Sequence, residues 1–344
     1  MRLLCIATLL LCFTPVAAAQ SSAATQVAPV APPAASTSLP PITDMDVVAV
    51  SGMQPGPGMW RVSKGDHVLW VMGTLSPAPK KMVWISRDVE ATIAASQLVM
   101  KSPGASVDSD LGVFRSALLI PSLFKARKNP DGATLKDVLP PDLYARWQVL
   151  KLKYIGRDAG IEKWRPIFAA NELYEAAVKK SGLATSGIVS PVVDKAAKRH
   201  DVKIVSPIVR LKVEDPKKAI KEFSGTALGD VECFRKTLDR LETDLTGMTL
   251  RANAWAIGDI EALRELPYDD QNRACIRAML EASVAQKRGL DTLPQKIEAE
   301  WLATAENALR DNTSTFALLP ISELLKPDGY LAKLQAKGYE VVAP

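Results

Sequence analysis

The sequence predicts an α/β protein with one mixed central sheet, formed by N-terminal and C-terminal strands, and a large helical middle section. Three observations predict it. Hydrophobic residues make up 47% of the 344 residues and charged residues 24%, which is the balance of a globular protein. Short β-type runs occur near both ends of the folded part. Between these runs, apolar residues recur with the spacing of an α-helix.

The N-terminus is typical of an export signal. Met1-Arg2 is followed by an apolar stretch, Leu3–Phe13, which is too short to span a bilayer. Ala17-Ala18-Ala19 supplies the small residues that a signal peptidase recognises. We expect a signal peptide at residues 1–19, cleaved after Ala19, and a periplasmic or secreted protein. The alternative is an uncleaved membrane anchor.

Residues 20–44 are expected to form a disordered tether. They are mostly Ala, Ser, Thr, Pro and Val, a composition that cannot bury enough apolar surface to offset the conformational entropy of folding. The folded domain is therefore expected at residues 45–344. No later apolar run reaches the length of about 18 residues that a membrane helix needs, so the processed chain is not expected to be an integral membrane protein.

The charge pattern argues against nucleic-acid binding. The formal net charge is +5, and the basic residues are spread along the chain. Lysine pairs such as Lys80-Lys81, Lys179-Lys180 and Lys217-Lys218 are isolated from one another in the sequence. Nucleic-acid readers usually gather Lys and Arg on one face, so we expect no nucleic-acid partner.

Two cysteines remain once the signal is removed. Cys5 and Cys12 belong to the expected signal, which leaves Cys233 and Cys275. An even number of cysteines in an oxidising compartment predicts one disulfide between them. The alternative is a pair of buried free thiols. Neither cysteine belongs to a Cys-x-x-Cys motif, so no catalytic role is expected.

The first elements are a hairpin, a helix and a strand. Two β-type runs within 60–72 flank the turn Lys64-Gly65-Asp66, which predicts the hairpin. Its second strand ends in Gly73-Thr74-Leu75-Ser76-Pro77. Helical spacing of apolar residues predicts a helix at 84–96, and the short apolar run 97–100 predicts a strand.

The middle is predicted to be helical and the end to return to strands. Helices are expected at 140–155, 161–181, 190–199, 228–257, 271–310 and 327–336. Strands are expected at 202–205, 315–319 and 339–342.

Two stretches carry a resemblance to a known family. Near the start stands Trp60-Arg61-Val62-Ser63, followed after the turn by Leu69-Trp70-Val71-Met72-Gly73-Thr74. Near the end stand Phe316–Leu324, Pro327-Asp328-Gly329 and Gly338-Tyr339-Glu340-Val341. The chain resembles the TraB/GumN family, bacterial relatives of TIKI-type metallopeptidases, over most of residues 55–343. The resemblance implies an α/β fold and a metal-dependent hydrolase.

The sequence departs from the family where the metal would bind. In the family, Gly-Thr-x-His and Gly-x-x-His elements and nearby acidic residues complete the site. Here Gly73 and Thr74 are retained, but Ser76 stands at the first histidine. Glu323, preceded by Ser322, stands at the second. The family also has an acidic residue after the third strand. The corresponding position in this chain falls around Lys101-Ser102, where no acid is present.

These departures predict a degenerate site without a metal cofactor. A serine hydroxyl is a poor ligand for a divalent metal, and a lysine ammonium repels a second cation. We therefore favour a non-catalytic domain that binds an unknown ligand or envelope protein in the former cleft. The former active-site positions are Gly73, Thr74, Ser76, Lys101, Ser102, Ser322 and Glu323.

Two other hypotheses stay open. The first is an active metal-dependent hydrolase of peptidase type whose rebuilt site uses Glu323 and Asp328. The second is an accessory factor in envelope polysaccharide assembly, suggested by the GumN name within the family.

Overall fold

The computed structural model describes residues 53–80, 82–108, 117–226, 228–266 and 271–344. All of them belong to one compact unit. The expected signal peptide at 1–19, its cleavage after Ala19 and the tether at 20–44 lie outside the described residues, as do Cys5 and Cys12. Among the described residues, no helix has both the length and the apolar character needed to cross a bilayer.

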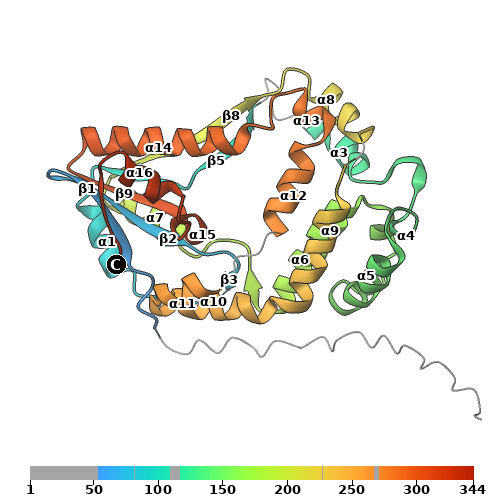
Figure 1. The fold of residues 1–344 in the computed structure, drawn as a ribbon, viewed down its shortest axis with the longest axis horizontal. Helices are drawn as coiled ribbons and strands as arrows, with labels where there is room; N and C mark the ends of the chain where they lie inside the picture. Colours follow the sequence, from blue (N-terminus) through green and yellow to red (C-terminus); the bar gives the residue numbers. More distant parts are fainter. Residues whose placement is uncertain (1–52, 81, 109–116, 227, 267–270) are drawn as a thin grey trace, which may run out of the picture. The chain divides into compact units, whose positions relative to one another are not determined.

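A six-stranded sheet lies at the centre of the unit, with strand order β10-β1-β2-β9-β4-β7 (Figure 1). The hairpin β1–β2 and the pair β1–β10 are antiparallel, whereas β2, β9, β4 and β7 are parallel. The sheet is therefore mixed and joins both ends of the described chain, as the sequence predicts. Its strands are β1 (Met59–Lys64), β2 (His67–Thr74), β4 (Leu98–Met100), β7 (Lys203–Val205), β9 (Ser314–Pro320) and β10 (Glu340–Val342).

Two smaller pairings accompany this sheet. β3 (Ala78–Pro79) pairs with β6 (Leu183–Ala184) in antiparallel orientation, and β5 (Gly104–Asp108) pairs with β8 (Ile208–Lys212) in parallel. The sequence patterns did not predict these four strands, because each is too short or too exposed to show a β-type apolar pattern.

The remaining elements are helices, most of them in the middle of the chain. They are α1 (Arg87–Ala94), α3 (Ile120–Ala126), α4 (Leu135–Val138), α5 (Pro141–Tyr154), α6 (Pro166–Lys180), α7 (Ser190–Arg199), α8 (Pro216–Ser224), α9 (Val231–Thr243), α10 (Leu245–Ile257), α11 (Ile260–Glu265), α12 (Gln271–Leu280), α13 (Ser283–Gln286), α14 (Leu293–Asp311), α15 (Ile321–Leu324) and α16 (Tyr330–Ala336). Short 3-10 turns occur at Pro130–Gly132 and Gly160–Lys163.

Two long predicted helices are interrupted. The stretch expected as one helix at 228–257 is α9 followed by α10, separated at Asp244, whose backbone is non-helical and whose carboxylate accepts from Arg251 of α10. The stretch expected at 271–310 is divided into α12, α13 and α14. Gly289, with φ of +63°, and Pro294 near the start of α14 explain the break between α13 and α14.

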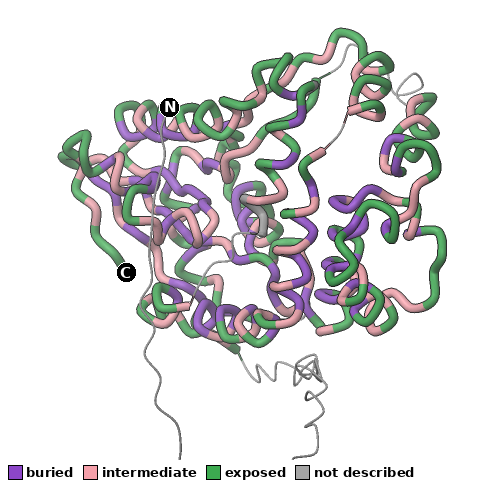
Figure 2. The backbone as a smooth tube through the Cα atoms, turned by 45° about the vertical axis from the view of Figure 1, so that its right-hand side comes forward, coloured by how far each residue is buried: buried purple, intermediate pink, exposed green. Residues whose placement is uncertain are grey.

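Two hydrophobic cores stabilise the unit. The first surrounds the six-stranded sheet and contains two fully buried tryptophans, Trp255 of α10 and Trp301 of α14. The second lies among α5, α6 and α9, where Trp147 packs against Phe234. Figure 2 shows buried segments in both parts of the unit. The second core explains why α5, α6 and α9 pack together apart from the first core.

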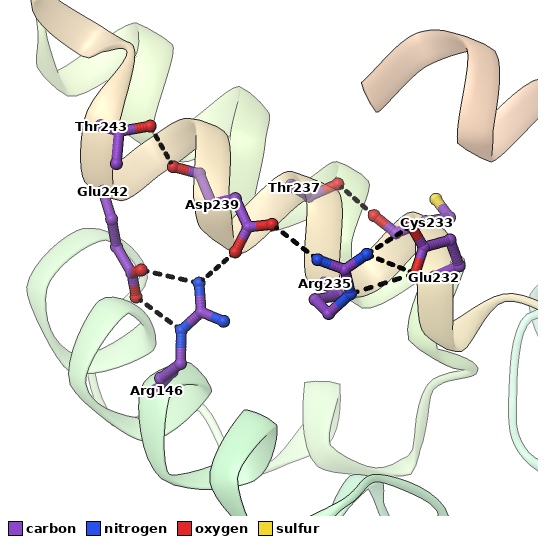
Figure 3. Close-up of polar contacts among 8 residues, drawn as sticks. All are labelled: Arg146, Glu232, Cys233, Arg235, Thr237, Asp239, Glu242 and Thr243. Atoms are coloured by element: carbon purple, nitrogen blue, oxygen red, sulfur yellow. Dashed lines mark hydrogen bonds and ion pairs between the residues drawn. The ribbon is translucent and has the colours of Figure 1, made fainter. Parts of the chain in front are cut away.

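Arginines on two helices also join α5 to α9 and stiffen α9 (Figure 3). Arg146 of α5 donates to Asp239 at 2.7 Å and to Glu242 at 2.6 Å. Arg235 donates to Glu232 and Asp239 on its own helix. Because Asp239 contacts both arginines, the two sets of ion pairs form one network.

A disulfide fixes α12 to α9. Cys233, buried in α9, is bonded to Cys275 of α12 across a sequence separation of 42 residues. The expected pairing is therefore present, and the alternative of free thiols does not describe this structure. A link of this length restricts the unfolded chain and holds α12 beside the second core.

Replacing both cysteines, Cys233→Ala with Cys275→Ala, is expected to lower the free energy of unfolding by about 3–4 kcal/mol, because the unfolded chain regains the entropy of the open loop. Urea unfolding followed by circular dichroism measures the change. Reduction of the unaltered protein should also lower its urea midpoint. Reduction should not change the midpoint of the double variant. Equal midpoints for all samples would contradict a stabilising link.

Candidate functional site

The carboxyl ends of four parallel strands lie at one edge of the sheet. Thr74 of β2 is opposite Pro320 of β9, and Met100 of β4 is opposite Ala317 of β9 and Val205 of β7. Ligands in open α/β sheets bind outside this edge. The candidate site consists of the predicted positions that fall on or just after these strand ends, namely Gly73, Thr74, Ser76, Lys101, Ser102, Ser322 and Glu323.

Gly73 and Thr74 are the last two residues of β2. A Cβ on Gly73 would stand 2.4 Å from Cδ1 of Ile321, so the close approach of α15 to β2 requires glycine here. The Gly73 carbonyl accepts a 2.9 Å hydrogen bond from the buried Trp255 indole, and the Thr74 hydroxyl donates to the Leu319 carbonyl at 3.3 Å. These contacts place the two residues in a supporting role.

Ser76 is exposed and faces a segment from the middle of the chain. Its hydroxyl donates to the Thr185 carbonyl at 3.0 Å. The adjoining β3–β6 pair brings residues 183–185 beside the loop that follows β2. Thr185 also lines a groove of about 770 Å³, together with Tyr154, Glu175 and Lys179. The Ser76 loop therefore borders a groove whose other walls come from α5 and α6.

Lys101 is held by a partner on a neighbouring helix. Its ammonium lies 2.5 Å from Oδ1 of Asp194 in α7, and its backbone N–H donates to the Val205 carbonyl at 2.9 Å. The positive charge is thus balanced locally by a carboxylate. Ser102 follows directly and is half-buried at the same strand end.

Glu323 is also paired within its own segment. Its carboxylate accepts from the Lys326 ammonium at 2.5 Å, three residues further on. The neighbouring Tyr330 is buried, and burial, followed by the Glu323 and Glu298 carboxylates, raises the pKa of its phenol well above the ordinary value. Tyr330 therefore stays protonated at neutral pH and is not a general base.

The predicted residues share one edge but do not contact one another through polar groups. Within the part of the chain that the structure describes, no hydrogen bond or ion pair joins Ser76, Lys101 and Glu323. A single cleft lined by all of them stays a prediction.

The sequence analysis did not identify the partners of these residues. Lys326 could have been found, because residues three apart on a helical turn are neighbours. Asp194 and Thr185 come from remote segments, and only the folded chain places them here.

The residues at this edge do not fit a divalent metal. Both histidines lie at the opposite edge of the parallel strands. His67 is the first residue of β2, about 23 Å along the strand from Thr74 at the usual rise per residue, and His200 ends α7 ahead of β7. In the described ranges, no three His, Cys, Asp or Glu side chains cluster in a way that could hold a metal ion. A hydroxyl, a paired lysine and a paired glutamate are not a zinc-type ligand set.

The fold and the residues at this edge of the sheet define an α/β protein with a polar candidate site outside the carboxyl ends of its parallel strands. Comparison with protein-family models matches residues 58–343 to the TraB/PrgY/gumN family. The chain therefore belongs to this family. Neither the curated proteins nor the solved structures gave a significant match.

Gly73→Ala is expected to lower the free energy of unfolding by about 1–3 kcal/mol, because the new methyl group overlaps Ile321. Ile321→Val removes the Cδ1 atom in the way, so the same glycine substitution should cost less in that background. A double-mutant cycle measured by urea unfolding gives the coupling. Additive losses would show that the contact does not determine the need for glycine.

Proposed function

We propose that this TraB/PrgY/gumN protein is an exported, non-catalytic member that binds a ligand or a partner at the candidate site. One observation carries the proposal: the ionisable side chains at the strand ends are already neutralised by partners within the chain. Lys101 is paired with Asp194, and Glu323 is paired with Lys326. A hydrolytic metal site needs imidazole and carboxylate groups that are free to coordinate.

The same pairing suggests the chemistry of the ligand. Two internal ion pairs leave the edge without a strong net charge, and the remaining groups are the hydroxyls of Thr74, Ser76, Ser102 and Ser322. Hydroxyls donate and accept hydrogen bonds without requiring an opposite charge. The ligand that fits best is therefore neutral and polar, such as a neutral oligosaccharide. This agrees with the hypothesis of an accessory role in polysaccharide assembly.

A rebuilt hydrolase has less support. Its two carboxylates would be Glu323 and Asp328, but Glu323 is engaged by Lys326 and Asp328 is exposed. General acid and base roles require side chains whose pKa is tuned by burial or by a second charge.

Export rests on the N-terminal pattern described above. The polar edge suits an envelope compartment in which extracellular glycans are present. Determination of the N-terminus of the protein purified from its own host tests the cleavage after Ala19.

We expect the natively purified protein to contain less than about 0.1 equivalent of transition metal, because the hydroxyls and paired charges at this edge are not the ligands that hold such an ion. The paired variant Ser76→His with Glu323→His should gain zinc affinity, because it returns two imidazoles to the edge. Metal content is measured by mass spectrometry, and zinc binding by isothermal titration calorimetry.

A matched control places two histidines on separate helices, Thr243→His in α9 with Glu300→His in α14, both at exposed positions. Equal zinc affinity in the control would mean that the candidate site has no special geometry. A stoichiometric metal ion in the unaltered protein that is lost on Glu323→Ala would overturn the proposal in favour of the enzyme.

Ligand binding is tested with a panel of neutral and acidic oligosaccharides on the unaltered protein, by calorimetry. We expect binding within the neutral set, and a loss of about fivefold or more in affinity for Ser76→Ala, because a hydrogen bond of about 1 kcal/mol is removed. Ser224→Ala is the control, since Ser224 also donates only to a backbone carbonyl, Ile220. Binding confined to acidic glycans would contradict the proposed ligand class.

A further inference from the structure

The disulfide between α9 and α12 joins two sulfurs that differ in exposure. Cys233 is completely buried, whereas Cys275 is half-buried and the next residue, Ile276, is 53% exposed. A thiolate that attacks a disulfide selects between its two sulfurs partly by access. The Cys275 sulfur is therefore the one that a thiol in solution reaches first.

Few packing contacts hold α12 on the protein. The helix lies beside α9 and next to α13 (Figure 1). Of the α12 side chains that the structure describes, Ala278 alone is buried, and Met279 is 36% exposed. Ala278 belongs to a small third cluster that it shares with Ile167 and Cys233. Because a helix in a folded protein is stabilised mainly by the face that it buries, the disulfide is the principal attachment of α12.

The neighbours of α12 are fixed without the disulfide. α9 is held by Phe234 in the second core and by the ion pairs of Arg146. The buried Asp230 carboxylate, just before α9, accepts from the Ile167 N–H at 3.1 Å and links α9 to the start of α6. On the other side of α12, Ala282 is buried directly before α13. Loss of the disulfide therefore affects α12 first.

Once released, α12 is not expected to stay helical. It has 10 residues, and isolated helices shorter than about 12–15 residues are only marginally stable in water. Ile167 and Cys233 would also lose the cover that Ala278 provides. Breaking one bond would thus open a local segment and expose apolar surface at the first turns of α6 and α9.

We propose that the Cys233–Cys275 bond is a redox switch, which a dithiol protein reductant opens to release α12. A thiolate of the reductant attacks Sγ of Cys275 and forms a mixed disulfide with it. The electron pair of the broken bond leaves with Cys233, whose sulfur takes a proton from water. The second thiolate of the reductant then attacks its own sulfur in the mixed disulfide and expels Cys275, which is protonated in the same way.

The balance of this exchange is one disulfide for another. The chain gains two thiols, and the reductant is oxidised to its own disulfide. The inference does not depend on the candidate site or on its ligand.

The site of attack is tested with a thioredoxin whose second active-site cysteine is replaced by serine, because this reductant stops at the mixed disulfide. It is added to the full chain as its host produces it. Peptide mapping by mass spectrometry should find the thioredoxin on Cys275. A mixed disulfide on Cys233 would overturn the proposal. So would the absence of any mixed disulfide under conditions in which the urea-unfolded chain forms one.

The release of α12 is measured by amide hydrogen exchange of the folded protein before and after reduction. Exchange in α12 should rise by a factor at least about tenfold larger than in α14, since α12 opens locally while α14 belongs to the first core. Cys233→Ala with Cys275→Ala should show the fast α12 exchange with and without reductant.

Two variants separate the switch from a general loss of stability. Gly73→Ala weakens the sheet and keeps the disulfide, so it should not raise exchange in α12 more than in α14. Cys275→Ser leaves Cys233 as a buried thiol beneath α12. Its reaction with iodoacetamide in the folded protein should be fast, because α12 no longer stays in place.

Two further results would overturn the proposal. Equal factors for α12 and α14 on reduction would show that the bond only stabilises the whole chain. A Cys233 thiol that stays unreactive in folded Cys275→Ser would show that packing alone keeps α12 in place.

Discussion

The parallel pairing of β2 with β9 is the constraint on which the other features depend. It joins strands from the two ends of the folded chain in a register that runs from Val68 and Ser314 to Thr74 and Pro320. The hydrogen bond from Thr74 to Leu319 spans 245 residues of sequence. Because β4 and β7 extend the same parallel sheet, every strand end that contributes to the candidate site is positioned by this pairing. Ile321 and Leu324 of α15 then crowd the position that a Gly73 side chain would occupy, and the Trp255 indole donates to the Gly73 carbonyl.

At the strand ends, the backbone elements and the charged side chains have different roles. Gly73 and Thr74 end β2, and α15 follows β9 directly. The charged groups present, however, form their own ion pairs with α7 and with the turn after α15. Such pairs stabilise the local structure. The groove bordered by Thr185 lies toward α5 and α6.

The helices of the middle section have a separate role. They have a core around Trp147 and Phe234, joined by the ion pairs of Arg146 and the disulfide at Cys233. This part of the chain supplies Thr185 to the Ser76 loop. The segments next to it, α3 and α8, line an apolar groove.

Local patterns in the sequence determined the fold class, the first hairpin, the strands at both ends and the partners in the disulfide, because alternation, turn chemistry and cysteine count are local or compositional signals. The short strands β5 and β8 and the partners Asp194 and Thr185 were decided only by tertiary structure. Each of these depends on contacts between segments far apart in the chain, and the energy of such contacts leaves no periodic trace in the sequence.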